Sequence, residues 1–160
     1  MKNLVTEIHY VEKQEQELSQ DEAELLAAAK KATFTSYSAY SHFSVGAALR
    51  LDNGEIITGS NQENCAYPSG LCAERTAVFY ANANFPNNAI THLCIAARDV
   101  RGNFTKLPVT PCGACRQVLS ETEKRFSKPI QIILYGTEGL YIINSANDML
   151  PISFDSDFLE

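Results

Sequence analysis

Long apolar runs are absent from this 160-residue sequence, and no uninterrupted hydrophobic segment is long enough to cross a membrane. Residues 1–10 lack the apolar core and the small-residue cleavage site of a secretory signal. Basic residues are outnumbered by acidic ones, 13 against 19, so the formal charge is −6. Nucleic-acid-binding proteins usually carry a basic surface. These absences predict a cytoplasmic protein with no membrane or nucleic-acid partner and a small, uncharged ligand.

Internal repeats, low-complexity tracts and linkers rich in Pro, Gly or Ser are also absent. With 45% hydrophobic residues the chain can form one compact domain with its own core, and its length argues against two. Residues 1–18 are the exception, because residues 12–18 are highly polar and would suit a mobile arm, although Leu4, Ile8 and Tyr10 could anchor the first half. We therefore expect an N-terminal extension of unassigned role at residues 1–18 and a single domain over residues 19–160.

The hydrophobic pattern predicts a mixed α/β domain. Ser19 and Glu22 form a capping box, which predicts a helix from this point to about Ser36. The Asn53-Gly54 pair predicts a hairpin turn between two strands. The remaining expected elements are helices at residues 71–83 and 112–125, with strands at residues 43–51, 55–60, 90–97, 130–135 and 140–144. This order predicts a mixed five-stranded sheet with helices on both faces.

The five cysteines are an odd number, which in a reducing compartment indicates metal ligands and buried thiols rather than disulfides. Cys72 stands alone, whereas Cys112 and Cys115 form a C-x-x-C pair. Three ligands are the usual number for a catalytic zinc that keeps one coordination position open. Glu74 is too close in sequence to Cys72 to bind the same ion easily, but it could lie beside the open position and transfer protons. The pattern predicts a hydrolytic zinc site.

The three cysteines are expected in the first turns of two helices, where free amides and the helix dipole favour thiolates. Three thiolates outweigh the charge of zinc, and Arg75 and Arg116 are the nearby cations that could offset the excess. A closed structural zinc site is the alternative interpretation, but it needs a fourth ligand. No candidate stands out, because the histidines are isolated and Cys94 lies in an expected core strand.

The segments Cys72-Ala-Glu74 and Pro111-Cys-Gly-Ala-Cys115 resemble the motifs of zinc-dependent nucleoside deaminases. Further likeness to the short-chain, homotetrameric cytidine deaminases lies in Phe43-Ser-Val45-Gly-Ala-Ala-Leu, Asn61-Gln-Glu63-Asn64 and Tyr67-Pro-Ser-Gly70. The resemblance spans roughly residues 20–155. It implies a three-layer α/β/α fold, a zinc cofactor, and hydrolysis of cytidine and 2′-deoxycytidine to uridine, 2′-deoxyuridine and ammonia in pyrimidine salvage.

The resemblance also implies roles for individual residues. Zinc hydroxide would attack the ring carbon that bears the amine while Glu74 moves the protons, and Arg75 would donate hydrogen bonds to the ligand sulfurs. Phe43 would stack on the base, and the Ala73 amide would bind the base carbonyl. Asn61 and Glu63 would bind the ribose. Four further residues would complete the active sites of neighbouring subunits in a homotetramer: Ala66, Tyr67, Gly70 and Phe154.

The residues alone leave alternatives for part of this set. Asn61 and Glu63 are spaced to face the same side, and so are Phe43 and Val45, but an exposed strand end and core packing explain such pairs equally well. Blasticidin S deaminases share the three-cysteine site, although Asn61 and Glu63 favour a ribose. Polynucleotide cytosine deaminases usually begin their ligand set with histidine and need a basic or aromatic surface. A zinc-stabilised binding module leaves Glu74 unexplained.

Overall fold

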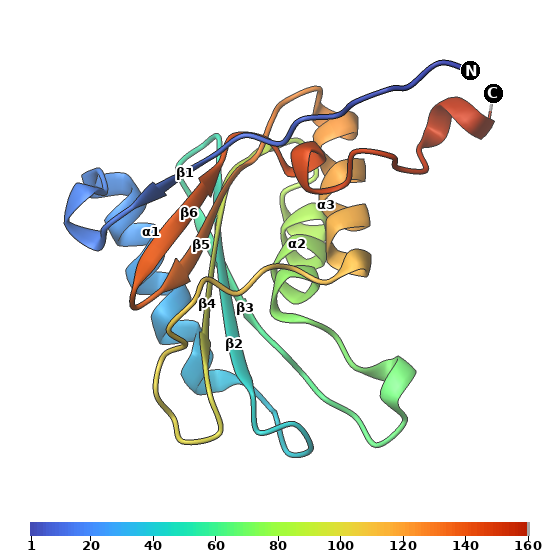
Figure 1. Cartoon of the computed structure of the whole chain (residues 1–160). Coiled ribbons are helices and arrows are strands. Elements are labelled where there is room, and N and C mark those ends of the chain that lie inside the picture. The colour runs from blue at the N-terminus through green and yellow to red at the C-terminus, as the bar shows by residue number, and fades with distance from the viewer. Residues whose placement is uncertain (160) are drawn as a thin grey trace.

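The computed structural model describes residues 1–159 and contains one sheet between two layers of helices (Figure 1). Helix α1 (Gln20–Ala32) covers one face of the sheet, and α2 (Ala73–Asn84) and α3 (Gly113–Phe126) lie side by side on the other. This confirms the predicted three-layer α/β/α fold. Glu160, the last residue of the predicted domain, lies outside the described residues. Within residues 1–159, the helices are too short or too polar for a membrane span.

The sheet has six strands rather than the five predicted, in the order β1-β6-β5-β4-β2-β3. β4 and β5 are parallel, because α3 connects them, and all other neighbours are antiparallel. The strands are β1 (Tyr10–Lys13), β2 (Ser44–Leu51), β3 (Ile56–Ser60), β4 (Ile90–Arg98), β5 (Gln131–Gly136) and β6 (Gly139–Ile143). Apart from β1, every long element lies within a few residues of its predicted position.

The unpredicted strand belongs to the N-terminal extension. β1 pairs with β6 in an antiparallel register, and the side chains of β1 are largely exposed. Two ion pairs tie the extension to α1: Lys13 to Glu22 at 3.4 Å and Glu15 to Lys30 at 2.8 Å. The second half of the extension is therefore packed on the domain and is not the mobile arm that its polar composition indicated. Its edge pairing uses the backbone, which leaves no apolar pattern in the sequence.

The core has one part on each face of the sheet, and alternate residues of β4 supply both. Leu93 and Ile95 pack beneath α2 and α3, while Cys94 and Ala96 pack beneath α1. Cys94 is fully buried, as expected for a core strand, and burial raises the pKa of its thiol. This thiol therefore stays protonated and takes no part in a metal site.

Candidate zinc and nucleoside site

The three predicted cysteine ligands meet where α2 and α3 begin. Cys72 and Cys112 are the residues that cap these helices, both with extended backbone conformations, and Cys115 lies in the first turn of α3. The Cys112 sulfur is 3.6 Å from that of Cys72 and 3.5 Å from that of Cys115. Residues far apart in sequence are thus brought together because both helices start at the same end of the sheet.

The sulfur geometry fits a tetrahedral zinc ion. Zinc–sulfur bonds of about 2.3 Å place tetrahedral sulfur ligands about 3.8 Å apart, close to the two observed distances. All three sulfurs lie within 4.8 Å of one another, and within residues 1–159 no further histidine, cysteine or carboxylate joins the group. Three ligands without a fourth match a site that keeps a position open for water or substrate.

Two arginines lie near the cysteines, but only one contacts a sulfur. Arg75 places its Nη2 3.7 Å from the Cys72 sulfur, as the sequence resemblance implied. Arg116 instead donates to the backbone carbonyls of Pro111 at 2.9 Å and Met149 at 3.2 Å. Arg75 therefore offsets the thiolate charge directly, whereas Arg116 braces the segment that precedes Cys112.

The protein environment shifts the pKa values of Cys72 and Cys115 in opposite directions. A hydrogen bond from Cys115 is the largest influence, burial opposes it, and Arg75 and Cys112 assist, so the pKa of Cys72 falls to about 5. The pKa of Cys115 is raised, first by its hydrogen bond to Cys72 and then by burial. The site is thus arranged to hold a thiolate at neutral pH, the form that binds zinc.

Glu74 lies in the first turn of α2, two residues after Cys72, and is 5% exposed. Burial raises the pKa of its carboxyl, and the negative charge of Cys72 raises it further. A buried carboxyl group whose pKa is raised suits repeated uptake and release of a proton. Its neighbour Ala73 is fully buried at the first position of the same helix.

A glycine on the adjacent strand allows α2 to approach the sheet. A Cβ atom on Gly59 of β3 would lie 2.6 Å from both the carbonyl oxygen of Ala73 and the amide nitrogen of Ala77. No side chain fits at that distance, so only glycine allows the first turn of α2 to rest on β3. Gly59 therefore helps to set the position of Cys72 and Glu74.

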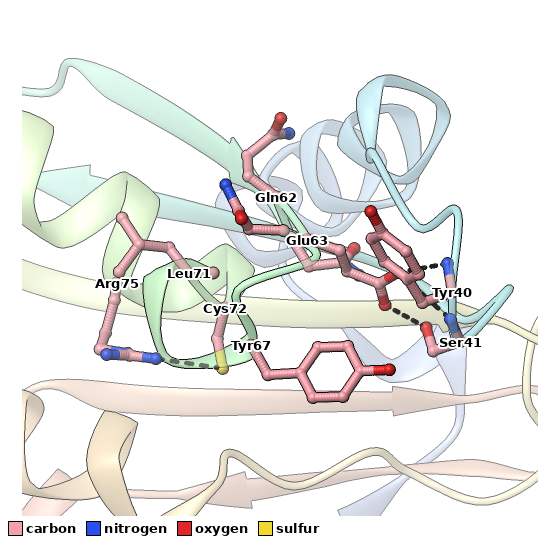
Figure 2. A pocket seen from close by; sticks show the side chains of 11 residues that line it. Tyr40, Ser41, Gln62, Glu63, Tyr67, Leu71, Cys72 and Arg75 are labelled. Carbon is pink, nitrogen blue, oxygen red and sulfur yellow. Dashed lines mark hydrogen bonds between the residues drawn. The ribbon is translucent and has the colours of Figure 1, made fainter.

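A cavity of about 520 Å³ opens beside Cys72 and Arg75 (Figure 2). Its volume is in the range of small-molecule sites. Of the predicted substrate residues, Asn61, Glu63, Tyr67 and Gly70 line it. The sequence prediction missed the other lining residues, Tyr40, Ser41, Gln62, Asn64 and Leu71. The signal for Tyr40 and Ser41 was their place directly before the expected Phe43 strand.

Asn61, immediately after β3, joins the ends of the hairpin strands with its side chain. Its Oδ1 accepts from the Val45 amide at 2.8 Å, and its Nδ2 donates to the Phe43 carbonyl at 2.9 Å. Val45 packs against the core, whereas Phe43 lies just before β2 and is half-buried. The second N–H of Asn61 remains available for another acceptor.

Glu63 lines the same cavity and points toward the loop formed by residues 40–43 (Figure 2). Its Oε2 accepts from the amides of Tyr40 at 2.8 Å and Ser41 at 3.2 Å, and its Oε1 accepts from the Ser41 hydroxyl. The Ser41 hydroxyl is the main cause of the lowered pKa of Glu63. The carboxylate is therefore ionised and can accept further hydrogen bonds.

Four predicted substrate residues do not line this cavity of the single chain, and one of them, Ala73, is fully buried in α2. Phe43 is half-buried at the end of the loop of residues 40–43, and Ala66 is exposed beside Tyr67. Phe154 is 60% exposed in the C-terminal segment, where its ring stacks on Phe158 at 5.7 Å. The aromatic ring of Tyr67, in contrast, packs edge-on against Tyr40, with centroids 6.1 Å apart.

Comparison with known proteins identifies the family. Residues 19–128 match the family model described as the cytidine and deoxycytidylate deaminase zinc-binding region. The chain is 42% identical over 137 residues to a cytidine deaminase of Halalkalibacterium halodurans, which covers 86% of this chain and 96% of that protein. It is 46% identical over 101 residues to a cytidine deaminase of Sporosarcina psychrophila, covering 63% and 69% of the two chains.

The fold agrees with these matches. The crystal structure of a cytidine deaminase from Burkholderia pseudomallei superposes with a TM-score of 0.69 at 36% identity, covering 82% of this chain and 97% of that one. The family-model match over residues 19–128 includes both helices that hold the three cysteines and the strands β2, β3 and β4. This chain therefore belongs to the zinc-binding cytidine deaminase family.

Proposed function

We propose that this chain hydrolyses both cytidine and 2′-deoxycytidine to uridine, 2′-deoxyuridine and ammonia, in cytoplasmic pyrimidine salvage. The observation that carries the proposal is the juxtaposition of three cysteine sulfurs, all within 4.8 Å of one another, with buried Glu74, next to a cavity of ligand size that Cys72 lines. Five free cysteines, three of them gathered at one site, are consistent with a reducing compartment.

The chemistry divides between the metal and Glu74. When bound, zinc lowers the pKa of a water molecule so that it becomes nucleophilic near neutral pH. Glu74 accepts a proton from that water and delivers it to the ring nitrogen next to the carbon that bears the amine. A carbon–oxygen bond forms at that carbon. Glu74 then transfers the second water proton to the departing amine, the carbon–nitrogen bond breaks, and ammonia leaves.

The remaining predicted residues would orient the nucleoside. Asn61 and Glu63 line the cavity beside Cys72, where an amide N–H and a carboxylate can bind ribose hydroxyls. We assign base stacking to Phe43 and recognition of the base carbonyl to the Ala73 amide. The polar pair in the cavity favours a sugar-bearing substrate over a blasticidin-type aminopyrimidine. The combination of an open zinc position with Glu74 favours an enzyme over a zinc-stabilised binding module.

We further propose a homotetramer in which Ala66, Tyr67, Gly70 and Phe154 complete sites between subunits. Phe154 supports this arrangement, because within its own chain it is anchored to α3 and does not line the cavity. Tyr67 and Ala66 are exposed, although the ring of Tyr67 lies at a substrate-sized cavity. A neighbouring subunit that covers Ala66 and Tyr67 would bury these exposed side chains and close the cavity that Tyr67 lines.

The test is the ultraviolet absorbance change of cytidine with the purified, zinc-loaded protein, with ammonia assayed in parallel. Glu74→Gln should lower turnover by about 10²- to 10⁴-fold, the range for loss of a general acid–base group, with zinc content unchanged. Glu121→Gln, an exposed position on α3, is the matched control and should leave turnover intact.

Two results would contradict the proposal. Substantial turnover in Glu74→Gln would remove the assigned role of that carboxylate. If the zinc-loaded wild-type protein failed to convert cytidine and deoxycytidine, the substrate assignment would be wrong, and aminopyrimidines such as blasticidin S would be tested next.

A further inference from the structure

The loop of residues 40–43, together with Tyr37 just before it, is bound closely to the segment that carries Asn61 and Glu63. The Tyr37 amide donates to the Asn61 carbonyl at 2.9 Å, and the Glu63 amide donates to the Tyr37 carbonyl at 2.8 Å. Within the loop, His42 has a φ of 55°, a left-handed conformation that non-glycine residues rarely adopt. The loop is thus held in one particular shape directly beside the proposed sugar-binding residues.

Ser41 connects the two sides of this arrangement through its hydroxyl. The Phe43 amide donates to Ser41 Oγ at 3.1 Å, a bond that spans His42. Because the oxygen accepts from Phe43, its hydroxyl hydrogen is free to point elsewhere, and it donates to Glu63 Oε1. The Ser41 hydroxyl therefore accepts a hydrogen bond from the Phe43 amide and donates one to the Glu63 carboxylate. Figure 2 shows the bond between Ser41 and Glu63.

The two oxygens of Glu63 depend on Ser41 to different degrees. Oε2 accepts from two backbone amides, those of Tyr40 and Ser41, which any residue at position 41 except proline would retain. Oε1 has the Ser41 hydroxyl as its donor among the described residues. Loss of that hydroxyl would leave the carboxylate anchored at Oε2 alone, so its rotation about the terminal bond would be less restricted.

Phe43 should keep its position when the Ser41 hydroxyl is removed, because other contacts hold it. Its carbonyl accepts from Asn61 Nδ2 at 2.9 Å, and the next strand residues remain paired with β3 and β4. Its amide lies in an exposed part of the loop and can bond to water instead of Ser41. Removing the hydroxyl should therefore disturb Glu63 while leaving the ring of Phe43 in place.

From these contacts we infer that Ser41 is a positioning residue for sugar recognition: its hydroxyl holds the Glu63 carboxylate in the orientation that accepts the ribose hydroxyls. The inference rests on the proposed function, because it assigns Glu63 to the sugar. A fixed carboxylate binds with less loss of side-chain entropy than a mobile one. Ser41 lines the cavity, but its hydroxyl donates its hydrogen to Glu63, so loss of that hydroxyl should affect substrate binding and not the chemical step.

The experiment compares cytidine with 2′,3′-dideoxycytidine, which lacks both vicinal hydroxyls. In Ser41→Ala we expect the KM for cytidine to rise about fivefold to tenfold, with kcat unchanged. This is the cost of immobilising one side chain, Glu63, when the substrate binds. The kinetic constants for dideoxycytidine should not change, so the preference for cytidine falls by the same factor. Ser41→Thr, which keeps the hydroxyl, should restore the preference.

Ser38→Ala is the matched control. Ser38 lies in the same loop region, and its hydroxyl bonds to that of Ser44 at 3.1 Å, not to Glu63. It should leave the cytidine preference unchanged. If Ser41→Ala weakened both substrates equally, Ser41 would be a general structural residue of the loop. If it weakened neither, Glu63 would not need the hydroxyl. Either result overturns the inference.

Wild-type kinetics separate this inference from the proposed function. A wild-type protein that fails to deaminate cytidine, or that treats cytidine and dideoxycytidine alike, removes the sugar-binding role of Glu63 before any serine variant is made. A wild-type protein that prefers cytidine, combined with an unchanged preference in Ser41→Ala, overturns only the role of Ser41.

Discussion

Gly59 illustrates how a residue without a side chain can control a metal site. The first turn of α2 rests against its backbone, with Ala73 and Ala77 atoms 2.6 Å from where a Cβ would lie. Gly59→Ala must push this turn outward, so we expect a loss of about 1–3 kcal/mol in unfolding free energy, typical of overpacking. Because the same turn carries Glu74 and follows Cys72, zinc affinity should also fall. Urea unfolding and competition with a chelator measure the two effects.

Gly113→Ala is the control for this prediction. Gly113 opens α3 directly after the ligand Cys112, but a Cβ there would meet no atom within 4 Å. The substitution should keep zinc affinity and raise stability by about 0.4–1 kcal/mol, because alanine restricts the unfolded chain. Equal zinc affinities in the two glycine variants would show that the contact with β3 does not position the site.

The sequence predicted which residues bind the metal, but it did not predict all the residues that shape the cavity. The three cysteines were identified as ligands because their spacing and residue type restrict the possible metal chemistry, and their sulfurs do meet. Ser41 and Tyr40 were missed because their contribution depends on a loop folding back onto Glu63. Gly59 was missed for a similar reason, since its need appears only when α2 packs on β3.

At the scale of elements, the start of α1 could be predicted from the sequence, because a capping box involves only residues close together in the chain. Ser19 Oγ accepts from the Glu22 amide at 3.2 Å, and Glu22 accepts from the Ser19 amide at 2.8 Å, which confirms the capping box. Strands with buried faces were also predictable from apolar runs. β1 was not, because its partner β6 is distant in sequence and its own side chains are mostly exposed.

The carboxylate of the capping box makes the stability of α1 depend on pH. Burial raises the pKa of Glu22, but hydrogen bonds from Ser19 and the charge of Lys13 outweigh it, so the net pKa lies below the usual 4.5. A lowered folded-state pKa adds stability that is fully present above pH 4.5 and is lost as the pH falls through the folded value. Glu22→Gln should cost about 0.3–1 kcal/mol at neutral pH.

Thermal unfolding of wild type and Glu22→Gln from neutral pH to well below pH 4.5 measures this effect. The difference in Tm between them should be largest at neutral pH and should shrink in the acid range. Glu121→Gln on α3 should show no such trend. A Glu22→Gln difference that stays constant over the whole pH range would show that ionisation of Glu22 does not stabilise the cap.

The N-terminal extension acts on the edge of the sheet. β1 satisfies the outer edge of β6, and Glu15 and Lys13 bind α1. Lys30, the partner of Glu15, also lies 4.0 Å from the ring centroid of Tyr135 on β5. We propose that this extension stabilises the domain and covers a strand edge that would otherwise pair with other chains.

Removal of residues 1–18 tests the role of the extension. We expect a loss of about 1–3 kcal/mol in unfolding free energy, because several net backbone hydrogen bonds disappear, together with self-association of the shortened chain. Removal of residues 1–9 alone retains β1 and both ion pairs, so it should match the full chain. Chemical unfolding and sedimentation measure stability and association, and equal behaviour of all three proteins would leave the extension without this role.

At the scale of the whole molecule, the C-terminal segment is anchored away from the cavity of its own chain. The Phe154 carbonyl accepts from Gln117 Nε2 at 2.7 Å, and Lys124 binds Asp155 at 3.3 Å and Asp157 at 2.5 Å. These contacts hold the segment against α3, while the Phe154 ring remains 60% exposed. This position agrees with the proposal that Phe154 contacts the substrate of a neighbouring subunit, because it does not line the cavity of its own chain.

Mixed oligomers distinguish a role of Phe154 between subunits from a role within one chain. A Glu74→Gln subunit lacks the proton-transfer group but supplies an intact Phe154, whereas a Phe154→Ala subunit has the reverse defect. Co-expression of the two should therefore create sites that combine an intact Glu74 with a neighbour's Phe154. We expect such mixtures to have a lower KM for cytidine than Phe154→Ala alone, because part of the sites regain the aromatic contact. If Phe154 served its own chain, every active site in the mixture would lack it, and the KM would equal that of Phe154→Ala.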